Sequence, residues 1–286
     1  MSKQRSLFEI HTAVFLFGLA GLFGKWISLS PTIIVLGRVF FASLALGFIL
    51  LLTKESLKIT PGKNYFLLFF MGLILSIHWI AFFKSIQVST VAIGLLSYSS
   101  FPIFTAFLEP LFLKEKLVKI NILFALLCLC GVCLIIPQFD LANSVYQGVL
   151  WGLLSGFTFA LLAIANRYLS QKYSSLIIAF FQDFFATLLL LPLFFLIQPA
   201  LSMGNILLLL ILGVFCTAGS HSLFIKGMRY IKAQTASIIS SLEPVYGIIL
   251  AFLLLGEVPS LRTILGGAII LGTTFTVSLR TSKKLT

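Results

Sequence analysis

Residues 233–259 read AQTASIISSLEPVYGIILAFLLLGEVP, and residues 91–117 read VAIGLLSYSSFPIFTAFLEPLFLKEKL. Each segment is a long apolar run with a proline near its middle, Pro244 or Pro102, and a glutamate thirteen residues after that proline. The two copies lie 142 residues apart in a chain of 286 residues. This spacing predicts a protein built of two similar halves.

The composition is typical of a membrane protein. Hydrophobic residues make up 59% of the chain and charged residues only 10%, against about 25% charged in an ordinary soluble domain. A soluble globule of this size cannot hide so much apolar surface from water. The composition therefore excludes a soluble enzyme, a disordered chain and a nucleic-acid-binding domain, despite the net charge of +12. The apolar runs are continuous rather than alternating, which argues against a transmembrane barrel.

The apolar runs have the length of membrane spans. A helix crosses about 30 Å of hydrocarbon in roughly 20 residues. We predict an all-α integral membrane protein with ten spans, at residues 10–27, 33–52, 65–86, 90–112, 119–136, 146–168, 174–196, 204–225, 233–255 and 261–279. The first five-helix repeat occupies residues 1–140 and the second occupies residues 141–286. Because five is odd, the second repeat must insert upside down relative to the first.

The distribution of basic residues predicts the orientation in the membrane. With the N-terminus in the cytoplasm, sixteen of the twenty lysines and arginines fall in inner loops or tails. Cytoplasmic loops of membrane proteins carry such an excess of positive charge. We therefore expect both termini in the cytoplasm, in a multi-pass protein of an inner or plasma membrane. Its surroundings are the lipid bilayer, and no nucleic acid is expected as a partner.

An inverted repeat has a physical use in transport. Two halves related by a pseudo-twofold axis in the membrane plane can exchange conformations, so that one site opens to each side in turn. The chain contains no H-E-x-x-H, P-loop or G-x-S-x-G motif, so we expect no enzyme, no cofactor and no metal site. The residues favour a transporter of a small-molecule substrate over a membrane-embedded enzyme, a channel or a scaffold.

Two stretches of the second half resemble a known family. Residues 233–245, together with Leu253–Glu257, are similar to the ninth-helix signature of the EamA family in the drug/metabolite transporter superfamily. Leu265–Gly272 resembles the tenth helix of that family, and residues 101–115 resemble a weaker first copy of the ninth. The resemblance implies ten helices in a five-plus-five inverted arrangement, around a central cavity lined largely by helices 1, 3, 4, 6, 8 and 9.

The first copy departs from the family pattern, since Phe101 stands where the second copy has Glu243, and Lys114 replaces the usual glycine. Members of this family mostly export amino acids and other small metabolites, and some import them. The resemblance thus implies a secondary transporter with amino acids, exported, as the favoured substrate class. Uptake or exchange of another metabolite, whether nucleoside-like, cationic or anionic, stays open, and a proton is the candidate coupling ion.

Glu243 is the first candidate for a substrate-binding residue. It lies ten residues into its predicted helix, near the bilayer midplane, where a carboxylate is costly and usually faces a cavity or a partner. Pro244 lacks an N–H and so frees the carbonyl of Ser240, which shares one helix face with Glu243 and Tyr246. This group suits a proton or a substrate ammonium. The alternative is a hydrogen-bonded carboxyl that joins two helices.

The first copy offers an aromatic counterpart to this acidic group. The equivalent positions are Tyr98, Phe101 and Phe104. Pro102 frees the carbonyl of Tyr98, as its counterpart does in the second copy. We expect the two broken helices to face each other, with one aromatic wall and one acidic wall. Such a site fits a substrate with an apolar body and an amine.

Two histidines, a tryptophan and two lysines are further candidates for substrate binding. His78 and Trp79 lie inside a predicted span, and the repeat offset places His221 opposite Trp79. A histidine near a cavity can titrate around neutral pH, and a tryptophan at mid-depth lies away from the interfacial aromatic belt. The alternative is ordinary packing. Lys84 and Lys226 are equivalent positions near helix ends, where they either bind an anionic group or extend to the lipid headgroups.

Other residues favour a structural role. Arg38 lies five residues into its predicted helix, from where its side chain reaches the interface, and Asp183 pairs with it only if the two helices come close. Glu257 is expected to pair with Arg262 at a helix end. Small residues allow close helix contact, which we expect at Gly18, Gly21 and Gly24 and at Gly148, Gly152 and Gly156.

Overall fold

The computed structural model describes residues 3–55, 57, 59, 62–113, 120–170, 172–228, 239 and 242–283. No strand occurs among these residues, which confirms the all-helical prediction. The helices of the first half are α1 Lys3–Trp26, α2 Pro31–Thr53, α3 Lys63–Val88, α4 Val91–Tyr98, α5 Phe101–Leu113 and α6 Ile120–Ile135. Those of the second half are α7 Ser144–Ser170, α8 Ser175–Ile197, α9 Met203–Gly213, the π-helix η1 Val214–Gly219, α10 Ser220–Met228, α12 Glu243–Leu255 and α13 Leu261–Lys283.

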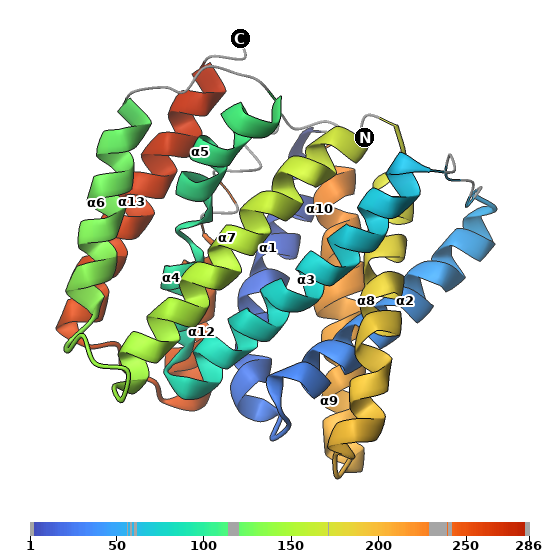
Figure 1. Ribbon diagram of the computed structural model, residues 1–286, viewed down its shortest axis with the longest axis horizontal. Coiled ribbons are helices and arrows are strands. Elements are labelled where there is room, and N and C mark those ends of the chain that lie inside the picture. Colours follow the sequence, from blue (N-terminus) through green and yellow to red (C-terminus); the bar gives the residue numbers. More distant parts are fainter. Residues whose placement is uncertain are drawn as a thin grey trace.

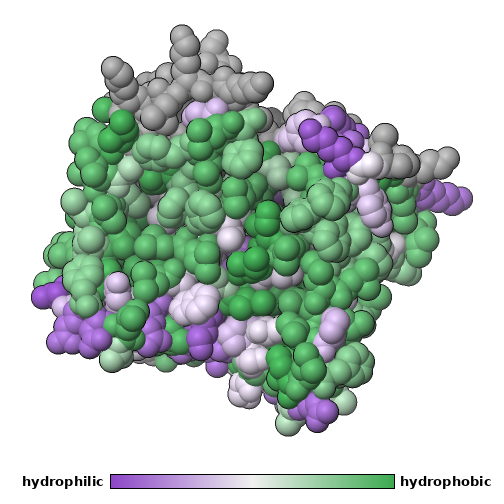
Figure 2. All heavy atoms as spheres, in the orientation of Figure 1, coloured by the Kyte–Doolittle hydropathy of each residue, from purple (hydrophilic) through white to green (hydrophobic). Residues whose placement is uncertain are grey.

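The helices have the length and composition of membrane spans. Within the described ranges, seven helical stretches are long and apolar enough to cross a membrane, if α4 with α5, and α9 with η1 and α10, each count as one stretch. Three shorter apolar helices are Ile122–Ile135, Glu243–Leu255 and Leu261–Thr276. Figure 2 shows hydrophobic side chains over the middle of the visible face and hydrophilic ones toward its two ends. The chain is a multi-pass membrane protein.

Helices of the two halves are interleaved in one body. The pair α6 and α13 forms one edge, and α2 packs against α8 and α9 at the other edge (Figure 1). Between these edges α3 packs against α7 and α8, α1 against α10 and α12, and α4 against α7 and α12. Each of these contacts joins a helix of the first half to one of the second. The two termini lie at the same end of the molecule (Figure 1).

A proline lies beside a break between two helices in the first half and at the start of a helix in the second half. α4 ends at Tyr98 and α5 begins at Phe101, while α12 begins at Glu243 after a turn at Leu242. A proline is the second residue of each new helix, where its missing N–H removes no helical hydrogen bond. The prediction that Glu243 lies ten residues into its helix is wrong, because the chain turns just before it. Of the predicted span 233–255, residues 233–238, 240 and 241 lie outside the described residues.

Two other helices differ from their predicted bounds. α1 begins at Lys3 rather than at residue 10, because Arg5 and Glu9 pair one turn apart at 3.5 Å and extend the helix with polar residues. The predicted span 204–225 is not one regular helix, since η1 divides it into α9 and α10. Hydropathy predicts neither feature, because the first segment is polar and the second is mostly apolar on both sides of the break.

Candidate functional site

Arg38 lies at the centre of the protein. Its side chain comes from the N-terminal half of α2, and only 3% of the residue is exposed. The guanidinium lies 3.7 Å from the centroid of the Trp79 ring on α3. Its Nε donates to Thr217 Oγ1 at 2.8 Å, and Nη2 donates to the carbonyl of Cys216 at 3.5 Å. The expectation that Arg38 reaches the membrane interface is therefore wrong.

The π-helix η1 supplies the polar partners of Arg38. In a π-helix the hydrogen bonds are rearranged, and such segments are frequent at functional sites. Thr217 Oγ1 donates to the carbonyl of Leu212 at 2.9 Å while it accepts from Arg38. The carbonyl of Cys216 accepts from both Arg38 and Ser220 Oγ. These contacts therefore join an arginine of the first half to the π-helix of the second half.

Two carboxyl groups face the same arginine. Arg38 interacts electrostatically with Asp183 on α8 and Glu243 on α12. The ion pairs within 4.0 Å among the described residues do not include Arg38. Asp183 is 1% exposed, and within the described part of the chain neither of its carboxyl oxygens has a hydrogen-bond partner. The centre thus holds one cation and two carboxyl groups that are close enough to interact but do not form a salt bridge.

An aromatic cluster adjoins this charged centre on the side of α4. The ring of Tyr98 stacks on that of Phe101 at 5.4 Å, and both contact Phe159 of α7, at 5.4 and 4.8 Å. The ring of His78 lies 5.6 Å from Tyr98 and 5.2 Å from Phe159. His78 Nδ1 also lies 2.9 Å from the carbonyl oxygen and 3.0 Å from Oγ of Ser155, which fixes the ring orientation. These contacts bring Tyr98, Phe101 and His78 together.

The remaining predicted rings lie on the side of α1, α10 and α12. His221 lies 6.2 Å from Trp79 and 5.5 Å from Phe17, measured between ring centroids. Tyr246 lies one turn beyond the start of α12, where its Oη is 3.3 Å from His11 Nδ1. Trp79 therefore connects the two sides, because it contacts both Arg38 and His221.

Two glycines allow the interrupted helices to come close to their neighbours. A Cβ at Gly18 of α1 would lie 2.9 Å from the carbonyl oxygen of Glu243, and one at Gly156 of α7 would lie 2.9 Å from that of Tyr98. Real Cβ atoms almost never approach so closely. Each interruption thus lies against a glycine on the first helix of the opposite half. The absence of a side chain at each glycine allows this close approach of the backbones.

Three predicted residues are not placed at this centre. Within the described part of the chain, no hydrogen bond or ion pair joins the half-buried Lys84 to it. Lys226 belongs to α10, but its side chain lies outside the described residues, as does the whole of Ser240. Sequence reasoning also missed residues of the centre. Arg38 could have been found because it is a charged residue within a predicted span. Nothing in the sequence distinguishes Phe159 from the other phenylalanines, of which the chain has thirty.

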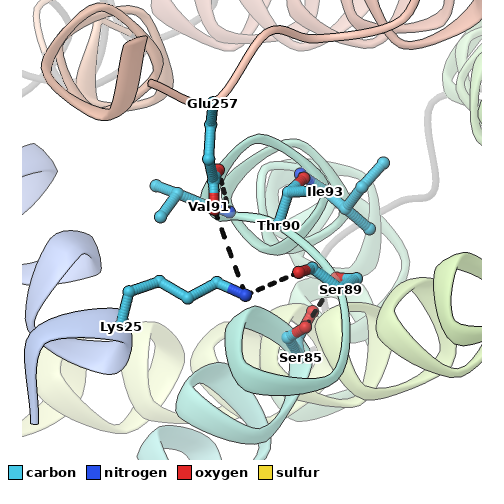
Figure 3. Close-up of polar contacts among 7 residues, drawn as sticks. All are labelled: Lys25, Ser85, Ser89, Thr90, Val91, Ile93 and Glu257. Carbon is cyan, nitrogen blue, oxygen red and sulfur yellow. Dashed lines mark hydrogen bonds and ion pairs between the residues drawn. The ribbon is translucent and has the colours of Figure 1, made fainter. Parts of the chain in front are cut away.

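A second polar group joins three segments at the end opposite the termini (Figures 1 and 3). Lys25 Nζ, at the end of α1, donates to the carbonyl of Ser89 at 2.7 Å and lies 4.0 Å from Glu257 Oε1. Glu257 Oε2 accepts from the backbone N–H of Val91 at 2.8 Å. Glu257 thus pairs with Lys25 and not, as expected, with Arg262. We call Lys25, Ser89, Val91 and Glu257 the polar tie.

Comparisons with known proteins agree with this architecture. The model of the EamA-like transporter family matches residues 5–136 and 146–279. The chain is 26% identical over 280 residues to the uncharacterized transporter YxxF of Bacillus subtilis (strain 168), covering 93% of this chain and 87% of that protein. It is 29% identical over 248 residues to an uncharacterized transporter of Helicobacter pylori (strain J99), covering 82% of each.

A protein of known crystal structure has the same fold. It superposes with a TM-score of 0.67, at 16% sequence identity, over 98% of this chain and 99% of that one. The family match covers nearly the whole sequence and both of its halves. The chain therefore belongs to the EamA-like transporter family.

Proposed function

We propose that this protein is a secondary transporter that moves a small organic metabolite by alternating access around the Arg38 centre. The observation that carries the proposal is a charged, aromatic-lined centre buried between helices of both halves of a membrane protein. Charged residues within membrane helices usually mark a substrate or ion pathway. The family of the chain and the names of its relatives are those of transporters, which fits transport rather than enzyme catalysis.

An inverted repeat is supported by equivalent features of the two halves. α5 runs from Phe101 to Leu113 and α12 from Glu243 to Leu255, so the offset is 142 residues at both ends. The contacts between the halves are also equivalent. α1 packs against α12, and its counterpart α7 packs against α4 and α5. Likewise α3 packs against α7, and its counterpart α10 packs against α1. The family match also falls into two parts, one in each half.

We propose ten spans, made of the seven long helical stretches and the three shorter apolar helices. Five spans in residues 1–140 and five in residues 141–286 would insert the two repeats with opposite orientation. The excess of lysine and arginine in the loops on one side supports cytoplasmic termini, and both termini lie at one end of the molecule. The membrane is then an inner or plasma membrane.

Amino acids, exported, are the favoured substrate class, with a proton as the coupling ion. A guanidinium can bind a carboxylate through two parallel hydrogen bonds, and Glu243 offers a carboxylate to an ammonium group. Tyr98 and Phe101 offer apolar faces to a side chain. A second candidate class is anionic metabolites, because Arg38 forms no ion pair among the described residues and would suffice to bind them.

The polar tie supports alternating access because it closes one end of the molecule. It joins α1, the start of α4 and the segment after α12. Opening that end requires α1 and the segment after α12 to move apart, so the tie must break once in each cycle. These contacts support a conformation that is closed at the end opposite the termini.

Transport by purified protein in proteoliposomes tests the proposal. The probes are L-phenylalanine, phenethylamine and 3-phenylpropanoate, which share an apolar ring and differ in the amine and the carboxylate. We expect saturable exchange of unmodified L-phenylalanine. Because a hydrogen bond to a charged group contributes about 1.5–3 kcal/mol, Arg38→Gln and Glu243→Gln should each lower it roughly tenfold or more.

The variants separate the substrate classes. If Glu243→Gln still exchanges 3-phenylpropanoate while Arg38→Gln does not, the substrate class is anionic. If Glu243→Gln leaves the exchange of L-phenylalanine unchanged, the acidic group plays no part in recognition. Exchange of all three probes that is no faster than in protein-free liposomes contradicts the amino-acid proposal.

A further inference from the structure

Asp183 is a buried carboxyl group that has no hydrogen-bond partner among the described residues. It lies in the middle of α8, and 1% of the residue is exposed. Both carboxyl oxygens are inaccessible to solvent, and neither has a hydrogen-bond partner. Thr187 Oγ1 donates to the backbone carbonyl of Asp183 at 2.8 Å, a contact within the helix that leaves the carboxyl group unsatisfied. Such a group in a well-ordered helix requires a physical explanation.

The nearby cation is bound elsewhere. Arg38 interacts electrostatically with Asp183, but its donors point to Thr217 and to the carbonyl of Cys216, and its plane lies over Trp79. An ionised carboxylate buried with neither a hydrogen bond nor an ion pair is strongly unfavourable. The neutral, protonated form of Asp183 is the one that fits these surroundings.

Among the side chains that the structure describes, Arg38 is the only charged group that interacts with Asp183. α8 packs against α2, α3, α7 and α10. The titratable side chains that the structure describes on these four helices are Arg38 on α2, Lys63, Tyr65, His78 and Lys84 on α3, Tyr146 and Tyr168 on α7, and His221 on α10. Of these, only Arg38 interacts electrostatically with Asp183. The protonation of Asp183 therefore depends on where the Arg38 guanidinium points.

We infer that Asp183 is the proton-binding residue of the transport cycle and that Arg38 controls its protonation. This inference rests on the proposed transport function and names the site of its coupling ion. Arg38 belongs to the first half, whereas η1 and α8 belong to the second. Movement of one half against the other changes the contacts of Arg38 with η1, which has the rearranged hydrogen bonds of a π-helix.

The step is a simple proton exchange. While Arg38 is bound to Thr217, the carboxyl O–H bond of Asp183 is intact. When Arg38 leaves Thr217 and turns to Asp183, that bond breaks, the proton passes to water in the opened centre, and the carboxylate pairs with the guanidinium. A nearby positive charge favours the ionised form of a carboxyl group. The return of Arg38 to η1 reverses the step, and no redox partner or second reactant is needed.

Infrared spectroscopy of the protein in lipid membranes tests this inference directly. A protonated carboxyl has a carbonyl stretching band separate from the carboxylate and amide bands, and its position shifts in heavy water. We expect such a band in the wild type at neutral pH, lost in Asp183→Asn and displaced in Asp183→Glu. Glu243→Gln is the matched control, because it removes the other carboxyl near Arg38 and should leave the Asp183 band in place.

Removal of the cation gives a readout that a structural role would not change. In Arg38→Gln the Asp183 band should persist at alkaline pH values that abolish it in the wild type, while Arg38→Lys should resemble the wild type. Identical wild-type and Asp183→Asn spectra overturn the inference, as does a band whose pH dependence is the same with and without Arg38. Because the bands are measured without flux, a band that behaves as expected in a protein without transport would refute only the proposed function.

Discussion

The polar tie predicts a defined change in conformational equilibrium when Glu257 is altered. Its Oε2 accepts the Val91 N–H at 2.8 Å, and its Oε1 lies 4.0 Å from Lys25 Nζ, with the two side chains 18% and 27% exposed. A hydrogen bond to a charged group contributes about 1.5–3 kcal/mol, and a partly exposed ion pair about 0.2–1 kcal/mol. Glu257→Gln keeps an acceptor and removes the charge, so we expect a loss of about 1.4 kcal/mol, or roughly tenfold in the closed-to-open equilibrium.

The assay is the labelling rate of a cysteine placed behind the tie. Leu95 of α4 is fully buried, so Leu95→Cys, in a chain whose four native cysteines are replaced by serine, reacts with a charged maleimide only when this end opens. We expect labelling roughly tenfold faster in Glu257→Gln, since the rate follows the open population when closing is fast. Labelling should be faster still in Glu257→Ala, because this variant also removes the acceptor of the Val91 N–H.

Asp140→Asn is the matched control for the labelling assay. Asp140 accepts the backbone N–H of Ala142 at 3.0 Å within its own loop, and its side chain has no hydrogen bond or ion pair to a second segment among the described residues. The Asp140→Asn variant therefore loses a similar hydrogen bond to a charged group without affecting the polar tie. Equal labelling rates in the wild type and both Glu257 variants, or the same acceleration in Asp140→Asn, would show that the tie does not hold this end closed.

The other predictions concern the centre and its glycines. Arg38→Lys keeps the charge but loses the planar contact with Trp79. Since a cation–π contact contributes about 0.5–2 kcal/mol, the melting temperature of the protein in detergent should fall. An unchanged melting temperature would contradict a stabilising contact. Gly18→Ala and Gly156→Ala should each destabilise by about 1–3 kcal/mol through overpacking, whereas Gly272→Ala, with nothing within 4 Å of its Cβ position, should be neutral; thermal denaturation compares the three. The spectroscopic effect of Asp183→Asn is the fourth prediction.

Membrane character and helix content could be predicted from the sequence because both are local properties. A run of about 20 apolar residues suits a bilayer whatever its neighbours are, and a proline disfavours an uninterrupted helix without any distant partner. α2 and α8, for example, begin and end within two residues of their predicted bounds. The family resemblance, carried by residues 233–257, is confirmed over nearly the whole chain.

The candidate site could be predicted only in part. The repeat spacing around Pro102 predicts Tyr98 and Phe101 as candidates, and the place of His78 inside a predicted span makes it another. The three rings lie together in the structure. Arg38 and Asp183 were assigned structural roles because their partners are far away in the chain. Arg38 and Thr217, for instance, are 179 residues apart, and the mostly apolar segment around Thr217 has no sequence pattern that predicts a π-helix.

The sequence by itself determined that this is a helical membrane protein of the EamA-like transporter family, because hydropathy along the chain and a family signature need no knowledge of neighbours. Only the tertiary structure decided that Arg38 lies over Trp79, that Asp183 is buried without a partner, and that Glu257 pairs with Lys25. These outcomes depend on which helices touch and on how each is rotated about its axis. Packing between distant segments sets both, since inside a bilayer helices associate through shape and a few polar contacts rather than through hydrophobicity.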